Sequence, residues 1–174
     1  MSNAVFKTER LQLRRFVPGD ASFVLALLNE PSFKQYIGDK GVNTLADAIA
    51  YIEQGPLANY DKYGYGVLVA ERCEDGEPAG MCGLFRRDNL DHPDLGFAFL
   101  ARYCRMGYAT EASCGVIGWA RDTLRLPLLA AIVNEENLRS RALIEKLGFR
   151  YEGAYRMSGE DEDLRYYALS LERG

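Results

Sequence analysis

Alternating apolar and polar residues, together with one short apolar run, mark the strands that this chain is expected to form. The run Leu128–Val133 is apolar at every position, which predicts a strand buried on both faces of a sheet. Residues 74–77 are turn-forming, so the strands on either side of them are expected to pair as an antiparallel hairpin. The predicted strands cover residues 8–16, 65–72, 79–86, 94–100, 128–133, 149–157 and 164–171.

Apolar residues at helical spacing predict four helices between these strands. Asp20 is a suitable N-cap for the first helix, and Thr44 with Asp47 forms the capping signal of the second. The Gly-Pro pair at residues 55–56 is expected to end the second helix, and Gly148 the last one. The predicted helices cover residues 20–28, 44–54, 108–124 and 136–147, and residues 57–64 are expected to be helical or irregular.

The predicted order of elements is β-α-α-β-β-β-α-β-α-β-β, and no repeat, low-complexity tract or linker divides it. We therefore expect a single domain over residues 1–174. Its class is expected to be α/β (α+β), with one mixed, largely antiparallel sheet of about seven strands flanked by about four helices. Parallel pairing is expected where a strand, a helix and a strand follow one another. Ligands of such sheets bind beyond strand carboxyl ends, which here is the turn between residues 100 and 108.

The composition excludes several classes of function. The 174 residues carry 21 basic and 25 acidic side chains, and the net charge of −4 argues against nucleic-acid binding driven by electrostatics. The longest apolar run, residues 126–133, is far shorter than the ~20 residues of a membrane helix. No secretory signal is recognisable, so we expect a cytoplasmic protein with no membrane partner. The four cysteines form no C-x-x-C step and His92 is the only histidine, so no metal site is expected.

The turn at residues 101–112 is the main candidate for chemistry. Gly107 and Ala109 are small enough for a ligand to approach the backbone closely. The first turn of the helix that follows has unpaired N–H groups and a partial positive charge, which favour an anion. Arg102 and Arg105 add positive charge on the same side. This pattern predicts a phosphate-binding turn; the alternative is a tight connection with two solvated arginines.

The segment CRMGYATEA, residues 104–112, resembles motif A of the GCN5-related N-acetyltransferase (GNAT) superfamily, in which Gln/Arg-x-x-Gly-x-Gly/Ala wraps the pyrophosphate of coenzyme A. Gly107 and Ala109 match the last two fixed positions, whereas Cys104 departs from the first. Asn137 and Ser140, followed by EKLGF at residues 145–149, resemble the RimJ/RimL-like branch, which modifies the N-termini of ribosomal proteins. The opening TERLQLRRF and the closing YYALSLER are similar to the first and last strands of the same branch.

This resemblance implies direct transfer of an acetyl group from acetyl-CoA to a primary amine. The acceptor that the branch implies is the α-amino group of a protein or peptide N-terminus. A small-molecule amine, such as a polyamine, an amino sugar or an amino-acid derivative, is the alternative acceptor. A non-catalytic sensor that binds acyl-CoA is an alternative of another class. A homodimer is expected because members of the branch often pair.

The resemblance also implies where acetyl-CoA binds. The strand at residues 94–100 splays from its neighbour, and the pantetheine arm fills the gap between them. Backbone N–H groups around Phe99 and Leu100 then face the thioester oxygen. The residues expected to bind acetyl-CoA are Phe99, Leu100, Arg102, Arg105, Met106, Gly107, Tyr108, Ala109, Thr110, Asn137 and Ser140.

Ser140 is the expected proton donor to the departing sulfur. Many members have a tyrosine directly before the EKLGF segment, where this chain has Ile144. Ser140 is the natural substitute by position, and it lies three residues from Asn137 on one helix face. The alternative interpretation of both residues is helix capping and solvent exposure.

Asp94 is the candidate general base, because DLGFAFL resembles the EIGYWL segment of the branch. It would accept a proton, through water, from the attacking amine. The alternative is a surface residue at the start of a strand. His92 is expected to be an exposed loop residue, and Glu111 to complement the dipole of its helix.

The segment at residues 29–38 corresponds to the wall of the acceptor pocket in the family. Glu30, Phe33 and Tyr36 are expected to line a slot for an amine-bearing chain end. The alternative is a surface loop whose aromatic residues cover the core. The acidic turn at residues 160–163 would attract a cationic acceptor, or else it is a solvated hairpin tip.

Overall fold

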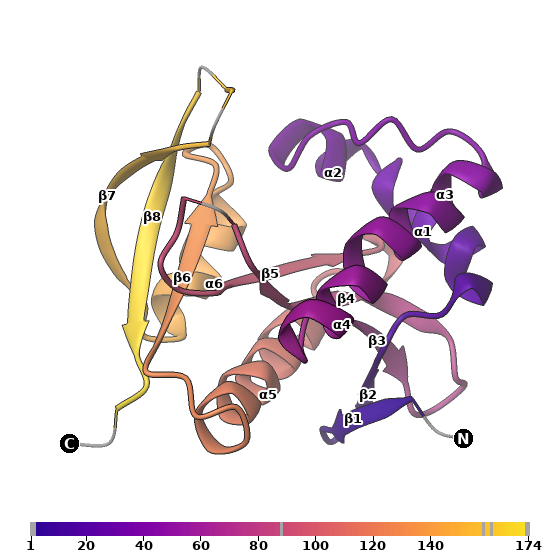
Figure 1. Ribbon diagram of the computed structural model, residues 1–174, viewed down its shortest axis with the longest axis horizontal. Coiled ribbons are helices and arrows are strands. Elements are labelled where there is room, and N and C mark those ends of the chain that lie inside the picture. Colours follow the sequence, from indigo (N-terminus) through magenta and orange to yellow (C-terminus); the bar gives the residue numbers. More distant parts are fainter. Residues whose placement is uncertain (1–2, 88, 158, 161, 173–174) are drawn as a thin grey trace.

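The computed structural model describes residues 3–87, 89–157, 159–160 and 162–172. They form an open sheet of eight strands in the order β1-β2-β3-β4-β5-β6-β8-β7 (Figure 1). Only β5 and β6 pair in parallel among the neighbours of this sheet, so the prediction of a mixed, largely antiparallel sheet is confirmed. The strands are β1 (Ala4–Lys7), β2 (Leu11–Arg14), β3 (Val67–Arg72), β4 (Pro78–Phe85), β5 (Asp94–Phe99), β6 (Leu128–Val133), β7 (Arg150–Arg156) and β8 (Asp163–Ser170).

The helices are α1 (Ala21–Leu28), α2 (Pro31–Tyr36), α3 (Leu45–Ile52), α4 (Ala58–Tyr63), α5 (Tyr108–Asp122) and α6 (Leu138–Lys146). Helix α2 lies within residues 29–38, the segment expected to form the wall of the acceptor pocket, where no helix is predicted from the sequence. The Gly-Pro pair at residues 55–56 does not end the helical path, because the π-helical turn Glu53–Leu57 leads from α3 into α4. The wider turn accommodates a residue that has no N–H group. In the described part of the chain, no helix is both long and apolar enough to cross a membrane.

The additional strand comes from the N-terminus, where the pattern predicts one strand over residues 8–16. The structure has a hairpin there: β1 and β2 pair across a turn in which the Thr8 amide donates to the Leu11 carbonyl oxygen at 2.8 Å. Glu111 of α5 holds this turn, since its carboxylate accepts from the Thr8 hydroxyl and, at 2.8 Å, from the Arg10 amide. The turn is therefore specified by a residue about a hundred positions away, which the local pattern does not contain.

Of the two predicted N-caps, that of α3 is confirmed and that of α1 is wrong. Thr44 and Asp47 form the predicted reciprocal cap, with the Asp47 amide 3.0 Å from Thr44 Oγ1 and the Thr44 amide 3.1 Å from Asp47 Oδ2. Asp20 does precede α1, but its side chain does not cap the helix. Its carboxylate accepts instead from both terminal nitrogens of Arg14, at 2.8 and 2.9 Å, and from the Val17 amide at 2.9 Å.

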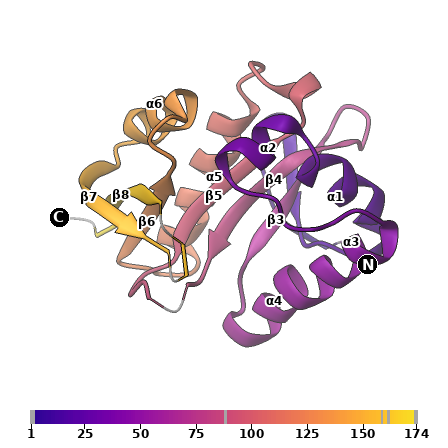
Figure 2. The ribbon, with the colours of Figure 1, turned by 90° about the horizontal axis from the view of Figure 1, so that it is seen from above.

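Helices cover both faces of the sheet and enclose two apolar cores (Figure 2). On one face, the buried stripe of α5 (Ala112, Val116 and Ala120) packs against residues such as Leu68 of β3. On the other face, α1 and α3 pack against residues such as Val69, which alternates with Leu68 along the same strand. Strands β3, β4 and β5 are thus the central layer.

β5 and β6 are paired only where β5 begins, against the middle of β6. Their register contains one residue pair, Asp94 with Ala130, and the Ala130 amide donates to the Pro93 carbonyl oxygen at 2.9 Å. β6 then continues beside β8, while β5 continues beside β4. The predicted splay of the central strand pair is confirmed, and the two strands diverge toward their carboxyl ends.

Candidate active site

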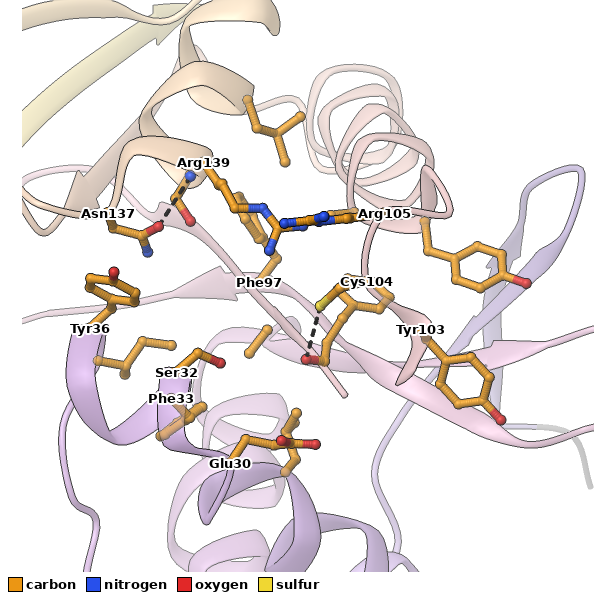
Figure 3. A pocket seen from close by; sticks show the side chains of 18 of the residues that line it. Glu30, Ser32, Phe33, Tyr36, Phe97, Tyr103, Cys104, Arg105, Asn137 and Arg139 are labelled. Carbon is orange, nitrogen blue, oxygen red and sulfur yellow. Dashed lines mark hydrogen bonds between the residues drawn. The ribbon is translucent and has the colours of Figure 1, made fainter. Parts of the chain in front are cut away.

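A cavity of about 390 Å³ opens where β5 and β6 have parted (Figure 3). Its walls come from α2, from β5, and from the N-terminal ends of α5 and α6. The cavity thus brings together three stretches that lie far apart in the sequence, within residues 27–37, 97–110 and 137–143. The predicted site residues that line it are Glu30, Phe33, Tyr36, Phe99, Arg105, Gly107, Tyr108, Ala109, Thr110, Asn137 and Ser140. Those that do not line it are Asp94, Leu100, Arg102 and Met106.

Sequence reasoning missed several residues of this cavity. Two of them could have been predicted. Phe97 lies two residues before Phe99 on the same face of a strand, and Arg139 lies between Asn137 and Ser140 at the start of a helix. Nothing in the local sequence pattern distinguishes Leu27 or Leu143 from an ordinary core leucine, so their place in the cavity wall was not predictable. The cavity residues that were not predicted are Leu27, Ser32, Ile37, Phe97, Ala98, Tyr103, Cys104, Arg139 and Leu143.

The turn before α5 has its backbone amides available for a ligand. Gly107 has a φ of +83°, a left-handed conformation that favours glycine, and among the described residues no side chain caps the helix there. The N–H groups of the first helical turn therefore lack intrahelical partners on the side of the cavity. Arg10 fixes the turn from outside, because its guanidinium donates to the Met106 carbonyl oxygen at 2.8 Å and to Glu111 Oε1 at 2.7 Å. Glu111 is accordingly structural, as its sequence position predicts.

Two arginines line the rim of the cavity. Arg105 belongs to the turn before α5 and Arg139 to the first turn of α6, and their side chains reach toward one another in Figure 3. Within the described residues, neither guanidinium has a carboxylate partner, and both side chains are exposed. Two cations without a counter-charge, together with open helix amides, make this end of the cavity suited to a phosphate. Arg102 does not contribute, since it stacks on the Tyr103 ring at 4.9 Å outside the cavity.

One side of β5 presents backbone amides to the gap. The Leu100 amide donates to the Ala79 carbonyl oxygen at 2.9 Å, so it is not available for a thioester oxygen, contrary to the prediction. Because the direction of backbone groups alternates along an antiparallel pair, Phe97 and Phe99 direct their N–H groups away from β4. β6 has already diverged at that point. Phe99 and Phe97 are therefore the residues whose amides face the cavity.

The start of α6 supplies polar groups to the opposite wall. The Asn137 side-chain oxygen accepts from the Ser140 amide at 3.3 Å, so Asn137 does cap the helix. Its amide nitrogen and the Ser140 hydroxyl remain for a ligand, since both residues line the cavity. Ile144 is 1 % exposed and belongs to the apolar core, so this position offers no polar group.

Helix α2 forms the remaining wall and is tied to the end of β5. Glu30 is its N-cap residue, and Glu30 Oε1 accepts from the Ala101 amide at 3.1 Å. Phe33 is 3 % exposed and anchors the helix in the second core. Tyr36 is half-buried, and Figure 3 shows its ring beneath Asn137.

A family model described as an acetyltransferase (GNAT) domain matches residues 10–150, which is most of the chain. This protein belongs to the GNAT acetyltransferase family. The uncharacterized N-acetyltransferase YoaA of Bacillus subtilis (strain 168) is 25 % identical over 172 residues, which cover 95 % of this chain and 96 % of YoaA. A solved acetyltransferase structure from Agrobacterium tumefaciens str. C58 has 27 % identity and a TM-score of 0.80, and the match covers 94 % of this chain and 92 % of that one.

The fold also matches a structure solved with ligands. The microcin C7 self-immunity acetyltransferase MccE, in complex with acetyl-CoA and AMP, has a TM-score of 0.73 and 17 % identity, with 93 % of each chain covered. At this identity the likeness concerns the fold alone. The conclusion that this protein is an acyltransferase therefore comes from the family model and from relatives such as YoaA.

Asp94 of the acetyltransferase lies on the other face of β5 from Phe97 and Phe99, because side chains alternate along a strand. It is 2 % exposed, and its Oδ1 lies 3.1 Å from Nε of Arg87. Burial raises the pKa of Asp94 to about 6, and the nearby Arg87 partly opposes this shift. Because the carboxylate is enclosed and already paired, the structure does not bring it to the cavity as the base that its position in the sequence predicts.

The acidic turn of the acetyltransferase is partly described. Ser158 and Asp161 lie outside the described residues. Glu162 accepts from Asn134 Nδ2 at 3.0 Å, and Asp163 pairs with Arg156 at 2.9 Å on the surface. None of the three described carboxylates, those of Glu160, Glu162 and Asp163, lines the cavity, which agrees with a solvated hairpin tip.

The raised pKa of Asp94 predicts how stability depends on pH. Between the ordinary carboxyl value of about 4 and the folded value of about 6, the folded state binds more protons than the unfolded state, so stability falls as pH rises. The full cost above pH 6 is ~3 kcal/mol. Asp94→Asn removes it, and we expect the difference in unfolding free energy between the two proteins to change by ~2 kcal/mol from pH 4 to pH 7 in urea titrations. Asp163→Asn, at an exposed pair, is the control and should show a constant difference.

Proposed function

We propose that this acetyltransferase is an acetyl-CoA-dependent N-acetyltransferase that acts on the α-amino group of a protein or peptide N-terminus. The observation that carries the proposal is the gap between β5 and β6, which opens into a cavity with unpaired cations at one end and strand amides along its side. Such a gap suits an elongated donor that is anionic at one end and has an electrophilic carbonyl at the other. The MccE structure, which has the same fold, was solved in complex with acetyl-CoA, and this supports the same donor.

The residues present fit acetyl-CoA in three places. The amides of the first turn of α5, together with Arg105 and Arg139, would hold its phosphates. Asn137 and Ser140 would contact the pantetheine arm from α6. Acetyl-CoA supplies an activated acetyl group as a thioester. The Phe99 amide would donate to the thioester oxygen as negative charge develops there, a contribution that is typically ~3–4 kcal/mol where it has been tested in other enzymes.

The acceptor would enter from the side of α2, where apolar side chains form the cavity wall. Ile37 is 46 % exposed beside the half-buried Tyr36, so a chain end with a side chain has an apolar surface to contact. Glu30 would keep α2 in place through its bond to the Ala101 amide. The resemblance of residues 137–149 to the RimJ/RimL-like branch is the further support for a peptide acceptor over a small amine.

Calorimetric titration with acetyl-CoA tests the donor, and thiol release in the same sample tests the reaction. We expect binding, and release of coenzyme A that depends on added peptides with free N-termini. Release with polyamines or amino sugars alone would contradict the peptide acceptor. Binding without release from any amine would contradict transfer and favour a sensor.

The arginine pair gives a sharper test of the donor site. We expect Arg105→Ala/Arg139→Ala to raise the Kd for acetyl-CoA by about 10- to 100-fold, because charge-assisted contacts to phosphate are lost. The measurement is calorimetry at two salt concentrations, since the variant should also lose part of the salt dependence. Arg102→Ala is the matched control, as Arg102 lies outside the cavity. A larger effect of Arg102→Ala than of the double variant would place the phosphates elsewhere.

A further inference from the structure

Transfer of an acetyl group from a thioester leaves a thiolate, which needs a proton donor at the site. Several residues with a hydroxyl group line the cavity, and their positions decide which of them could reach the thiolate. Tyr103 is committed to Arg72 and Arg102, whose guanidiniums lie 4.9 Å from its ring, and Figure 3 shows it directed away from the cavity. Thr110 belongs to the phosphate end in the first turn of α5, and Tyr108 is 5 % exposed. The hydroxyls that remain around the end of the gap are those of Ser32, Tyr36 and Ser140.

Resting on the proposed function, we propose that Tyr36 is the catalytic acid that protonates the departing thiolate. A phenol releases its proton much more readily than an aliphatic alcohol, so it is the better donor to a sulfur leaving group. Within the described part of the chain, no residue forms a hydrogen bond with the Tyr36 hydroxyl. In Figure 3 this hydroxyl is directed toward Asn137, at the wall from which α6 would contact the pantetheine arm.

Helix α2 is built to hold the phenol in this place. Phe33 lies three residues before Tyr36, on the same helix face, and its side chain is buried in the core beneath. The bond from the Ala101 amide to Glu30 fixes the beginning of the helix against the end of β5. The beginning of α2 is thereby fixed to the end of β5, and its middle is fixed to the apolar core. Ile144, at the corresponding place on α6, is buried and apolar, so α6 does not provide a phenol there.

The step balances without another reagent. The neutral amine forms the C–N bond at the thioester carbonyl carbon, and the carbonyl electrons move to the oxygen near the Phe99 amide. On collapse the C–S bond breaks with its electron pair on sulfur, and sulfur takes the Tyr36 phenolic proton. The proton that the nitrogen loses returns to the phenolate through water. The products are the amide and a free thiol, and Tyr36 is regenerated.

Tyr36→Phe tests the proposal, because it removes only the oxygen. We expect the kcat of thiol release to fall by about 100-fold, with the Kd for acetyl-CoA and the KM for the peptide within about twofold of the wild-type values. Calorimetry gives the Kd, and stopped-time thiol assays at saturating donor give kcat and KM. Tyr151→Phe is the matched control, and we expect it to keep the wild-type kcat because Tyr151 is 50 % exposed on β7 and does not line the cavity.

Two results would overturn the proposal. One is a Tyr36→Phe enzyme with unchanged kcat and a raised KM, which would make Tyr36 a wall residue of the acceptor site. The other is a wild-type kcat for Tyr36→Phe together with a large loss in Ser140→Ala, which would assign the proton to Ser140. A wild-type protein that binds no acetyl-CoA or releases no thiol with any amine would instead refute the proposed function, so the two failures are distinguishable.

Discussion

Gly107→Val is expected to weaken acetyl-CoA binding by about 100-fold while leaving the protein folded. Gly107 has a φ of +83°, a conformation that is strained by ~1–2 kcal/mol for any other residue and most of all for a β-branched one. An added Cβ would lie 3.2 Å from Nη2 of Arg10, which holds the turn from outside, so the larger side chain would crowd this contact. The substitution therefore changes the shape of the proposed phosphate-binding turn.

The measurement is the thermal shift produced by acetyl-CoA. At a ligand concentration 100 times the wild-type Kd, binding stabilises the wild-type protein by about 2.7 kcal/mol, whereas a 100-fold weaker variant gains only about 0.4 kcal/mol. Gly76→Val is the matched control, because Gly76 also has a positive φ, of +75°, but lies in the turn between β3 and β4 with open space around it. Gly76→Val should lose a similar amount of stability, and acetyl-CoA should raise its melting temperature as much as it raises that of the wild-type protein. Equal ligand shifts in both variants would show that the turn before α5 does not hold the donor.

Arg14→Leu is expected to destabilise the protein by about 3–5 kcal/mol, the largest effect on stability that we predict. The Arg14 side chain is 15 % exposed and joins three elements, since it bonds to Asp20 before α1 and, at 2.6 Å, to Glu71 of β3. The bond to Asp20 is the main cause of a raised pKa for Arg14. Without the guanidinium, the 7 % exposed Asp20 side chain keeps its buried charge with little more than the Val17 amide as a partner. Urea denaturation monitored by circular dichroism measures the loss.

Arg156→Leu controls for the removal of an arginine from an ion pair. Its pair with Asp163 has both side chains 57 % exposed, so we expect a change of less than about 1 kcal/mol. The double variant Arg14→Leu/Asp20→Leu should regain part of the stability that Arg14→Leu loses, because no buried charge is then left without a partner. A loss of under about 1 kcal/mol for Arg14→Leu would mean that water reaches Asp20 and that the pair acts as a surface pair.

Elements whose signals are local were predictable from the sequence. β6 has the predicted bounds, because its apolar run lies between Pro127 and the polar Asn134. The cap of α3 and the glycine after α6 were also correct, since each depends on groups within a few residues; Gly148 has a φ of +100°. The beginning of α5 at Tyr108 follows in the same way from Gly107.

Elements specified by distant contacts were not predictable in this way. The hairpin of β1 and β2 depends on Glu111, and helix α2 depends on the burial of Phe33 and on the bond between Glu30 and Ala101. Asp20 had a plausible local role as a cap, but the carboxylate found a stronger partner in Arg14. In each case a charged or aromatic side chain gains more from a residue elsewhere in the chain than from its neighbours.

The family, the mixed sheet and the two motif blocks that supply most of the cavity follow from the sequence, because these features are carried by residue type and spacing within short segments. Which of the candidate residues share the cavity depends on the fold. The fold brings Arg139, Arg105 and Tyr36 to one cavity, and it sets Asp94 on the far face of β5 against Arg87. The physical reason is that a side chain's direction depends on where the strands diverge and on which side of a strand or helix the residue lies. Both are consequences of packing between distant segments.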